Sequence, residues 1–238
     1  MFDGKRIMAL IPARGGSKGI KRKNIRELCG QPLIAHTIMT AKSSCYIDSV
    51  FVSTEDSEIA GIASSYGALV PMLRPIELAE DDSTTLDVVL HAVSEFINAD
   101  EWDALVLLQP TQPLRTTEDV DGAIEFFYKN NRKSVVSISE VNDSPILMRY
   151  FDECGNMKKL LEIRSTIRRQ EMPKYYRVNG AIYINALEEI NSTTSFNDNE
   201  LGFVIERSHS VDIDEEQDLI LAQYFYNRKN YYRSGDFK

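Results

Sequence analysis

The segment that follows the first apolar run combines glycines with a dense positive charge. It reads IPARGGSKGIKRKN over residues 11–24. Glycines beyond the carboxyl end of a strand let main-chain N–H groups approach phosphate oxygens closely, and the basic side chains add positive charge. The chain contains neither the Gly-Lys-Ser/Thr of a P-loop nor Gly-x-Gly-x-x-Gly. We therefore predict a triphosphate cradle of another type, with a solvated basic turn as the alternative.

Two carboxylates two residues apart form a second candidate. Asp212 and Asp214 end a strand-like segment, and alternate residues of an extended segment point to the same face. Mg²⁺ (or Mn²⁺) is bound by one or two carboxylates together with substrate phosphates, so the pair suits such a metal. The alternative is that Asp214 only caps the last helix, where Glu215 and Glu216 would favour the helix dipole.

Four further polar side chains stand at predicted element ends. Gln109 follows a central strand, where its amide can bond a sugar hydroxyl or amide, or be satisfied locally. Ser83 and Thr84 open a helix and either meet a nucleotide base or ribose or cap that helix. Arg115 is either a fork for phosphate or carboxylate or a charge at a helix entry.

Apolar runs that alternate with amphipathic stretches must position these groups. The expected strands are 6–11, 49–53, 68–70, 103–108, 134–139, 180–184 and 202–205; the expected helices are 32–42, 54–66, 83–98, 117–129 and one from about 214. Strands that alternate with helices imply βαβ units. The pattern predicts a three-layer α/β/α fold with a mostly parallel, Rossmann-like sheet.

The alternation is interrupted once. Residues 142–178 hold two prolines, scattered charges and a strand-like piece at 146–151, and the rhythm resumes at Gly180. We predict an α/β domain of residues 1–141 and 179–238 and an insert of residues 142–178 that leaves the main sheet.

Composition bounds the function classes. The 238 residues carry 27 Lys and Arg against 36 Asp and Glu, a formal charge of −9, which argues against general nucleic-acid binding. Apolar runs reach about five residues, far below the ~18 of a membrane span. The N-terminus has no signal-peptide pattern, and three scattered cysteines fit reduced thiols. We expect a cytoplasmic protein that binds neither nucleic acid nor membrane.

Seven motifs, in order along the chain, resemble the acylneuraminate cytidylyltransferases. They are the loop at 12–24, VSTED at 52–56, LRP at 73–75 with the stretch to Asp81, LQPTQPLR at 108–115, RQ at 169–170 with Pro173, NGAIYI at 179–184 and VDID at 211–214. The resemblance spans nearly the whole chain. It implies a nucleotidyltransferase sheet and transfer of CMP from CTP to the anomeric hydroxyl of a nonulosonic acid, with release of pyrophosphate.

The resemblance also implies roles for single residues. Arg14, Lys23, Asp212 and Asp214 would be catalytic, with the two aspartates as metal ligands. The nucleotide would be bound by Ala13, Arg14, Gly15, Gly16, Ser17, Lys23, Asn24, Arg74, Ser83 and Thr84. The sugar would be bound by Gln109, Arg115, Arg169, Asn179 and Tyr183. For Asn179 a locked turn, and for Tyr183 a place in the core, are the alternatives.

The insert resembles the family's dimerisation segment in position, so a homodimer is expected. Sialate-type members place a basic residue soon after the proline equivalent to Pro145, whereas this chain has Ile146, Leu147 and Met148 there. The acceptor is therefore an acidic nine-carbon sugar of open identity, with legionaminic and pseudaminic acid as alternatives. The eight-carbon acid Kdo and a non-catalytic nucleotide-sugar sensor are the rival hypotheses.

Overall fold

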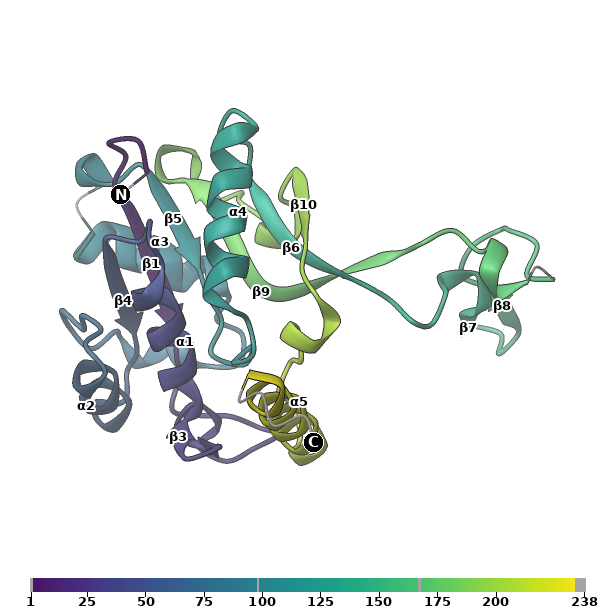
Figure 1. The fold of residues 1–238 in the computed structure, drawn as a ribbon, viewed down its shortest axis with the longest axis horizontal. Coiled ribbons are helices and arrows are strands. Elements are labelled where there is room, and N and C mark those ends of the chain that lie inside the picture. The colour runs from purple at the N-terminus through teal and green to yellow at the C-terminus, as the bar shows by residue number, and fades with distance from the viewer. Residues whose placement is uncertain (1, 98, 167, 234–238) are drawn as a thin grey trace.

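A six-stranded sheet with the order β10-β6-β9-β5-β1-β4 forms the centre of the molecule (Figure 1). The computed structural model describes residues 2–97, 99–166 and 168–233; the side chains at 99, 169 and 229–233 lie outside the described part. β1 is parallel to β4 and β5, and β6 is parallel to β10, whereas β9 is antiparallel to both β5 and β6. The six strands are β1 (Ile7–Pro12), β4 (Ser49–Ser53), β5 (Ala104–Leu107), β6 (Val135–Glu140), β9 (Tyr176–Ala186) and β10 (Leu201–Val204).

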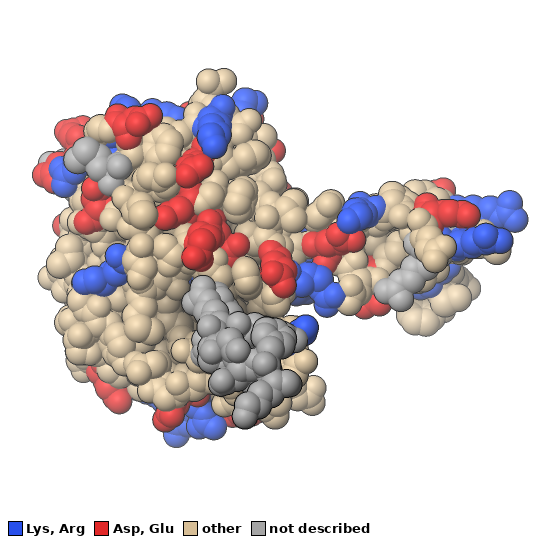
Figure 2. Space-filling view, viewed as in Figure 1, with Lys and Arg blue, Asp and Glu red and all other residues tan. Residues whose placement is uncertain are grey.

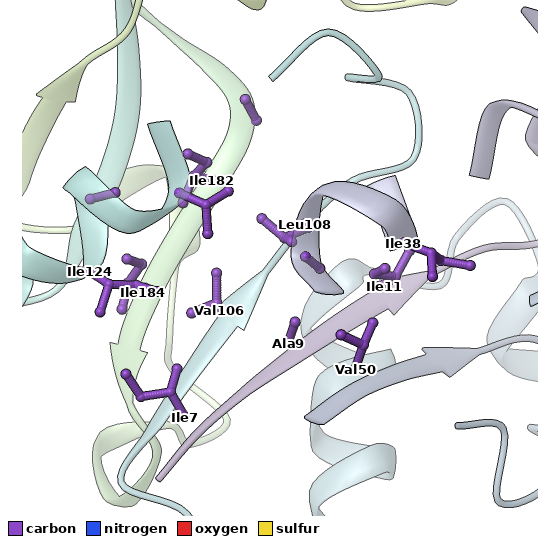
Figure 3. Close-up of a cluster of buried hydrophobic side chains, with 14 of the residues drawn as sticks. Ile7, Ala9, Ile11, Ile38, Val50, Val106, Leu108, Ile124, Ile182 and Ile184 are labelled. Carbon is purple, nitrogen blue, oxygen red and sulfur yellow. The ribbon is translucent and has the colours of Figure 1, made fainter. Parts of the chain in front are cut away.

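Helices cover both faces of this sheet because its strands are apolar on both sides. Alternate residues of β1 enter two different cores, with Ile7 and Ile11 on one face and Met8 on the other. The first core, part of which is drawn in Figure 3, packs against α1 (Leu33–Ser43), α2 (Ser57–Ser65) and α4 (Thr117–Lys129). The second packs against α3 (Thr85–Glu95). This arrangement confirms the predicted α/β class with a mostly parallel sheet.

A small hairpin and the last helix form a third apolar cluster below the sheet. β2 (Glu27–Leu28) and β3 (Gln31–Pro32) turn through Cys29 and Gly30, both at positive φ. Leu28 packs there with Ile213 and with Leu219 of α5 (Glu216–Arg233). The contact brings the end of the basic loop against the segment that carries the two aspartates, although about 190 residues separate them in the chain.

A long arm projects from the body between β6 and β9 (Figures 1 and 2). The two strands stay paired as far as Glu140 and Tyr176, and they lead to a distal hairpin of β7 (Arg149–Phe151) and β8 (Met157–Lys159). The predicted insert of residues 142–178 lies in this arm. The predicted end of the insert at residue 178 falls inside β9, because this strand runs without interruption from the arm into the sheet.

Two expected elements differ from the structure. The strand expected at 68–70 is reduced to one bridge between Phe51 and Leu69. Leu69 is half exposed at the sheet edge, and Pro71 follows two residues later and has no N–H with which to continue a ladder. The helix expected from 83 begins at Thr85. In the described residues no helix is long and apolar enough to cross a membrane.

Candidate active site

A cavity of about 390 Å³ opens beyond the carboxyl ends of β1 and β5. Ten residues that the sequence singled out line it: Arg14, Gly16, Ser17, Lys23, Asn24, Arg74, Ser83, Thr84, Gln109 and Asp214. Lys18, Asp81 and Thr111 also line the cavity and were not among the predicted site residues. Lys18 belongs to the cations of the predicted basic loop, whereas Asp81 and Thr111 were indicated only by their place inside the motifs. Ligands of open α/β sheets bind at this kind of location.

The basic loop is closed by bonds between its own residues. The main-chain N–H of Lys23 donates to Ser17 Oγ at 3.1 Å, and Asn24 Nδ2 donates to the main-chain oxygen of Arg14 at 2.8 Å. Asn24 is buried. Both polar side chains therefore fix the shape of the loop.

Two glycines allow the loop to approach its neighbours closely. A Cβ on Gly19 would overlap the main-chain oxygen of Asp214, and a Cβ on Gly15 would lie 2.5 Å from Asp56 Oδ2. A side chain at Gly19 would therefore displace the loop, and one at Gly15 would displace the loop or the Asp56 carboxylate. Ala13 lies below the loop, buried, with its N–H bonded to the main-chain oxygen of Ser53 at 2.9 Å.

Each cation that lines the cavity is paired with a carboxylate. Arg14 Nη1 and Lys18 Nζ lie 3.1 and 2.7 Å from the carboxylate oxygens of Asp81. Lys23 Nζ lies 2.8 Å from Asp214 Oδ1. The carboxylates of Asp81 and Asp214 are exposed, so an incoming polyphosphate can compete for the same cations.

A buried ion pair supports the loop from behind. Arg74 Nη2 lies 3.1 Å from Glu55 Oε2, and the two side chains are only 3% and 9% exposed. Glu55 Oε1 also accepts the main-chain N–H of Gly15 at 2.6 Å. Burial lowers the pKa of Arg74, the charge of Glu55 opposes that shift, and the nearby Arg14 adds to it. Arg74 thus reaches the loop through Glu55.

The carboxylates of Asp212 and Asp214 can supply two of the ligands that a bound cation needs. Partial desolvation raises the pKa of Asp212, and the charge of Asp214 raises it further, while a bond from Thr111 and the charge of Lys23 lower it. Across residues 2–97, 99–166 and 168–233 no three His, Cys, Asp or Glu side chains cluster as a metal cage. The two carboxylates repel each other, and a bound cation would relieve this repulsion. They fit Mg²⁺, which takes its other ligands from phosphates and water.

The start of α5 is capped by another residue than expected. Asp218 Oδ2 accepts the main-chain N–H groups of Asp214 and Glu215 at 3.0 and 2.8 Å. The carboxylate of Asp214 instead pairs with Lys23. The helix-capping alternative for Asp214 is therefore wrong for its side chain, which faces the cavity.

The hydroxyl groups at the start of α3 are engaged locally. Thr84 forms a capping box with Asp87, whose N–H donates to Thr84 Oγ1 at 3.2 Å, and Ser83 Oγ donates to the main-chain oxygen of Leu78 at 3.1 Å. The capping alternative is therefore present for Thr84 and not for Ser83, and both residues line the cavity.

Of the residues expected at the sugar, Gln109 lies at the cavity wall, whereas Asn179 and Tyr183 are buried in the sheet. Asn179 is buried inside β9, and its side chain bonds Ser137 Oγ at 2.6 Å and Ser139 Oγ at 3.2 Å on the neighbouring strand β6. Tyr183 is in the second core and donates to Asn197 Oδ1 at 2.9 Å.

Two arginines complete the set of expected residues. Arg115 is 2% exposed, its Nη1 and Nη2 groups bond Thr37 and the main chain of Gln109, and its Nε is buried without a partner. It borders the larger groove and not the smaller cavity, so its contact with the sugar stays a prediction. The side chain of Arg169 lies outside the described part of the chain.

A second, larger groove of about 1400 Å³ continues from the aspartates towards the base of the arm. Asp212 and Asp214 line this groove. Arg177 of β9, Tyr226 of α5 and His209, which precedes α5, line it as well. Asp214 also lines the smaller cavity. Asp214 therefore lies where the cavity and the groove meet, and Asp212 lies on the groove side.

Comparisons with known proteins assign the fold and the family. The sequence profile of a family described as cytidylyltransferase matches residues 8–230. A CMP-N,N'-diacetyllegionaminic acid synthase of Legionella pneumophila is 39% identical over 92% of this chain and 95% of its own length. A pseudaminic acid cytidylyltransferase of Campylobacter jejuni is 32% identical over 92% and 95%.

Two further similarities differ in extent. An N-acylneuraminate cytidylyltransferase of Escherichia coli is 32% identical over 94% of this chain but only 53% of its own length. The structure of a CMP:2-keto-3-deoxy-manno-octonic acid synthetase complexed with CTP superposes with a TM-score of 0.71 at 15% identity, over 94% of this chain and 100% of that one. The chain belongs to the cytidylyltransferase family and is a nucleotidyltransferase of the acylneuraminate cytidylyltransferase type.

Proposed function

We propose that this protein transfers CMP from CTP to the anomeric hydroxyl of a nonulosonic acid and releases pyrophosphate. The observation that carries the proposal is the 2.8 Å contact between Lys23 and Asp214. It joins the basic loop to the carboxylate pair where the cavity and the groove meet. The smaller cavity would take the nucleotide, and the acid would bind where Gln109 and Asp214 line its wall.

The reaction is a displacement at phosphorus. The anomeric oxygen forms a bond to the α-phosphorus, the bond from that phosphorus to the bridging oxygen of pyrophosphate breaks, and the hydroxyl proton is lost to solvent or to a base. Catalysis of such a transfer consists mainly of positioning and charge neutralisation. In the proposal Arg14 and Lys23 hold the triphosphate and offset the charge that grows on the leaving pyrophosphate.

Asp212 and Asp214 are the residues that would hold Mg²⁺. When bound, this ion supplies charge neutralisation and Lewis-acid polarisation at the phosphate oxygens. Lys23 would then leave Asp214 for the triphosphate, because a cation and a lysine compete for the same carboxylate.

Among the nonulosonic acids we propose N,N'-diacetyllegionaminic acid as the acceptor. The support is the 39% identity to a synthase of that name over nearly both full lengths, against 32% for the pseudaminic acid enzyme. Gln109 would bond the acceptor directly. Asn179 and Tyr183 would shape the wall behind it, and Arg169 is proposed for its carboxylate.

We further propose that the arm pairs two copies of the chain. Large apolar side chains are exposed on it, including Phe151 at 72% and Met157 at 65%. Exposed apolar surface of this kind marks an interaction site. Sedimentation analysis should give a dimer for the wild type and a monomer for Phe151→Asp with Met157→Asp; a monomeric wild type contradicts the proposal.

The test of the reaction is pyrophosphate release with CTP and Mg²⁺. The acids compared are N,N'-diacetyllegionaminate, N-acetylneuraminate, pseudaminate and Kdo, with and without EDTA. Release with legionaminate above all others, abolished by EDTA, is the expected result. Release with another acid would replace the acceptor but keep the reaction. Tight CTP binding without release from any acid would reject the reaction.

A further inference from the structure

Arg115 is a buried cation without an ion pair. Its side chain is 2% exposed, and no described carboxylate forms an ion pair with its guanidinium. Burial lowers the pKa of Arg115 to about 9, against the opposing charges of Asp119 and Asp212. Burying a charge without a paired partner is costly. A specific contact of the guanidinium has to offset this cost.

The guanidinium connects two elements that border the site. Nη1 donates to Thr37 Oγ1 on α1 at 2.9 Å, and Nη2 donates to the main-chain oxygen of Gln109. In return Thr40 Oγ1 donates to the main-chain oxygen of Arg115 at 3.4 Å. The planar fork therefore links α1, the helix that follows the basic loop, to Gln109 in the loop after β5.

The loop after β5 is held at three successive points. Besides the bond to Gln109, the main-chain oxygen of Thr111 accepts the N–H of Ile213 at 2.9 Å, and Gln112 Nε2 donates to the main-chain oxygen of Asn179. Ile213 lies between the two aspartates, and Asn179 lies where β9 leaves the body. The main-chain oxygen of Gln109 accepts the N–H of Gln112 at 3.3 Å as well as Nη2 of Arg115, and Arg115 is its side-chain partner.

Gln109 has little room to turn. A Cβ built on Gly180, which has a φ of +76°, would lie 2.9 Å from Gln109 Oε1 and 3.6 Å from Tyr183 Oη. The glycine thus leaves a narrow space that the amide occupies. A small tilt of the main chain at Gln109 would move this amide out of that space, since side chain and carbonyl belong to the same residue.

We propose that Arg115 is a positioning residue that orients Gln109 towards the acceptor through the main-chain carbonyl of Gln109 and does not touch the substrate. The inference rests on the proposed function, in which Gln109 contacts the acid. Lysine cannot replace the arginine here, because one ammonium group cannot span Thr37 and Gln109 in a fixed geometry.

A double-mutant cycle tests this inference. Pyrophosphate release is measured for wild type, Arg115→Lys, Gln109→Ala and the double variant, with kcat and KM obtained separately for CTP and for the acid. We expect Arg115→Lys to raise the KM of the acid about tenfold and that of CTP less than about twofold. The double variant should match Gln109→Ala, because the lysine has no amide left to misplace.

A matched control is available at the other end of β5. Arg132 Nη2 donates to the main-chain oxygen of Asp103 at 2.7 Å, far from the cavity, so Arg132→Lys should leave both KM values unchanged. Thr37→Val keeps the charge and removes one bond, and it should raise the KM of the acid less than Arg115→Lys does. This variant also carries the test if Arg115→Lys fails to fold.

The outcomes separate the two proposals. Equal changes in both KM values, or a full Arg115→Lys effect in the Gln109→Ala background, would overturn the positioning role. An active Gln109→Ala with an unchanged KM for the acid would overturn the assignment of Gln109, and Arg115 with it. A wild type that releases no pyrophosphate from any acid would instead overturn the proposed reaction.

Discussion

The two sides of the basic loop use the same interaction in opposite ways. On the cavity side, Lys18 and Arg14 pair with the exposed carboxylate of Asp81. On the rear side, Arg74 pairs with Glu55 where water is nearly excluded, and Glu55 also holds Gly15. Exposed pairs contribute little and exchange partners readily, whereas a broken buried pair leaves an uncompensated charge. The buried pair of Arg74 and Glu55 therefore fixes the loop. On the cavity side, Arg14 and Lys18 can release the carboxylate of Asp81 and bind phosphate instead.

The largest effect should come from breaking the rear pair. Arg74→Met or Glu55→Met should each lower the free energy of unfolding by about 3–5 kcal/mol, because the partner is left buried and unpaired. Thermal and urea unfolding measure this loss. The double variant should lose less than the sum of the singles. Additive losses would mean that the two charges do not interact, which would contradict the claim that the buried pair fixes the loop.

The next largest effect should be on turnover from the cavity side. Lys23→Met should lower kcat for pyrophosphate release about 10²–10³-fold, the loss typical of one preorganised electrostatic donor. The unfolding free energy should change little, since Asp214 is exposed and regains water. Lys21→Met, on the same loop, is the matched control. Wild-type turnover in Lys23→Met would remove this residue from the mechanism.

A smaller effect should appear where the loop meets α2. Burial raises the pKa of Asp56, but bonds from Arg22 and from the N–H groups of Ile59 and Glu58 outweigh this and lower it below 3.8. A carboxyl group with a lowered pKa in the folded state stabilises above its unfolded pKa and loses this contribution as pH falls through the folded one.

Asp56→Asn keeps the helix cap and removes the charge. It should therefore cost about 1 kcal/mol at pH 7, or about 2–4 °C in Tm. The difference from wild type should shrink as the pH is lowered below 3.8. Thermal unfolding at a series of pH values measures it. A difference that is constant from pH 7 to pH 3 would show that the charge of Asp56 is not what stabilises this contact.

The smallest effect should be a gain. Asp81→Asn removes the carboxylate that competes with phosphate for Arg14 and Lys18, so the KM of CTP should fall about two- to fivefold at low salt. The gain should vanish at about 0.5 M salt, where such contacts are screened. Asp82→Asn changes the net charge equally, and Asp82 has no ion pair among the residues that the structure describes. If both variants lower the KM of CTP equally, the effect comes from the net charge and not from competition between Asp81 and phosphate.

Local patterns were sufficient for much of the fold. The period of the apolar residues predicted α1, α4 and the strands that lead into the loops at residues 13 and 109, because burial on one or both faces sets that period. Strand order and the antiparallel direction of β9 could not be predicted, since both depend on pairings between residues far apart. The strand expected at 68–70 failed for a local reason, the proline at 71.

The site divides in the same manner. The basic loop could be recognised because glycines and cations adjoin a strand end within a single short segment. The bonding partners of Arg115 and Asn179 could not be predicted. The type of a residue does not indicate whether its polar groups face a cavity or bond a distant segment of the chain. Asp214 shows the difference directly: the sequence suited both a cap and a ligand, and Asp218 took the capping role.

The sequence by itself determined the elements, the basic loop and the family resemblance, because each is encoded in residues that are neighbours in the chain. Tertiary structure decided which groups meet: Lys23 with Asp214, Arg74 with Glu55, and Arg115 with Gln109. These contacts depend on sheet order and on the docking of α5 against the hairpin. Both follow from burying apolar surface across the whole molecule, and no short segment contains that information.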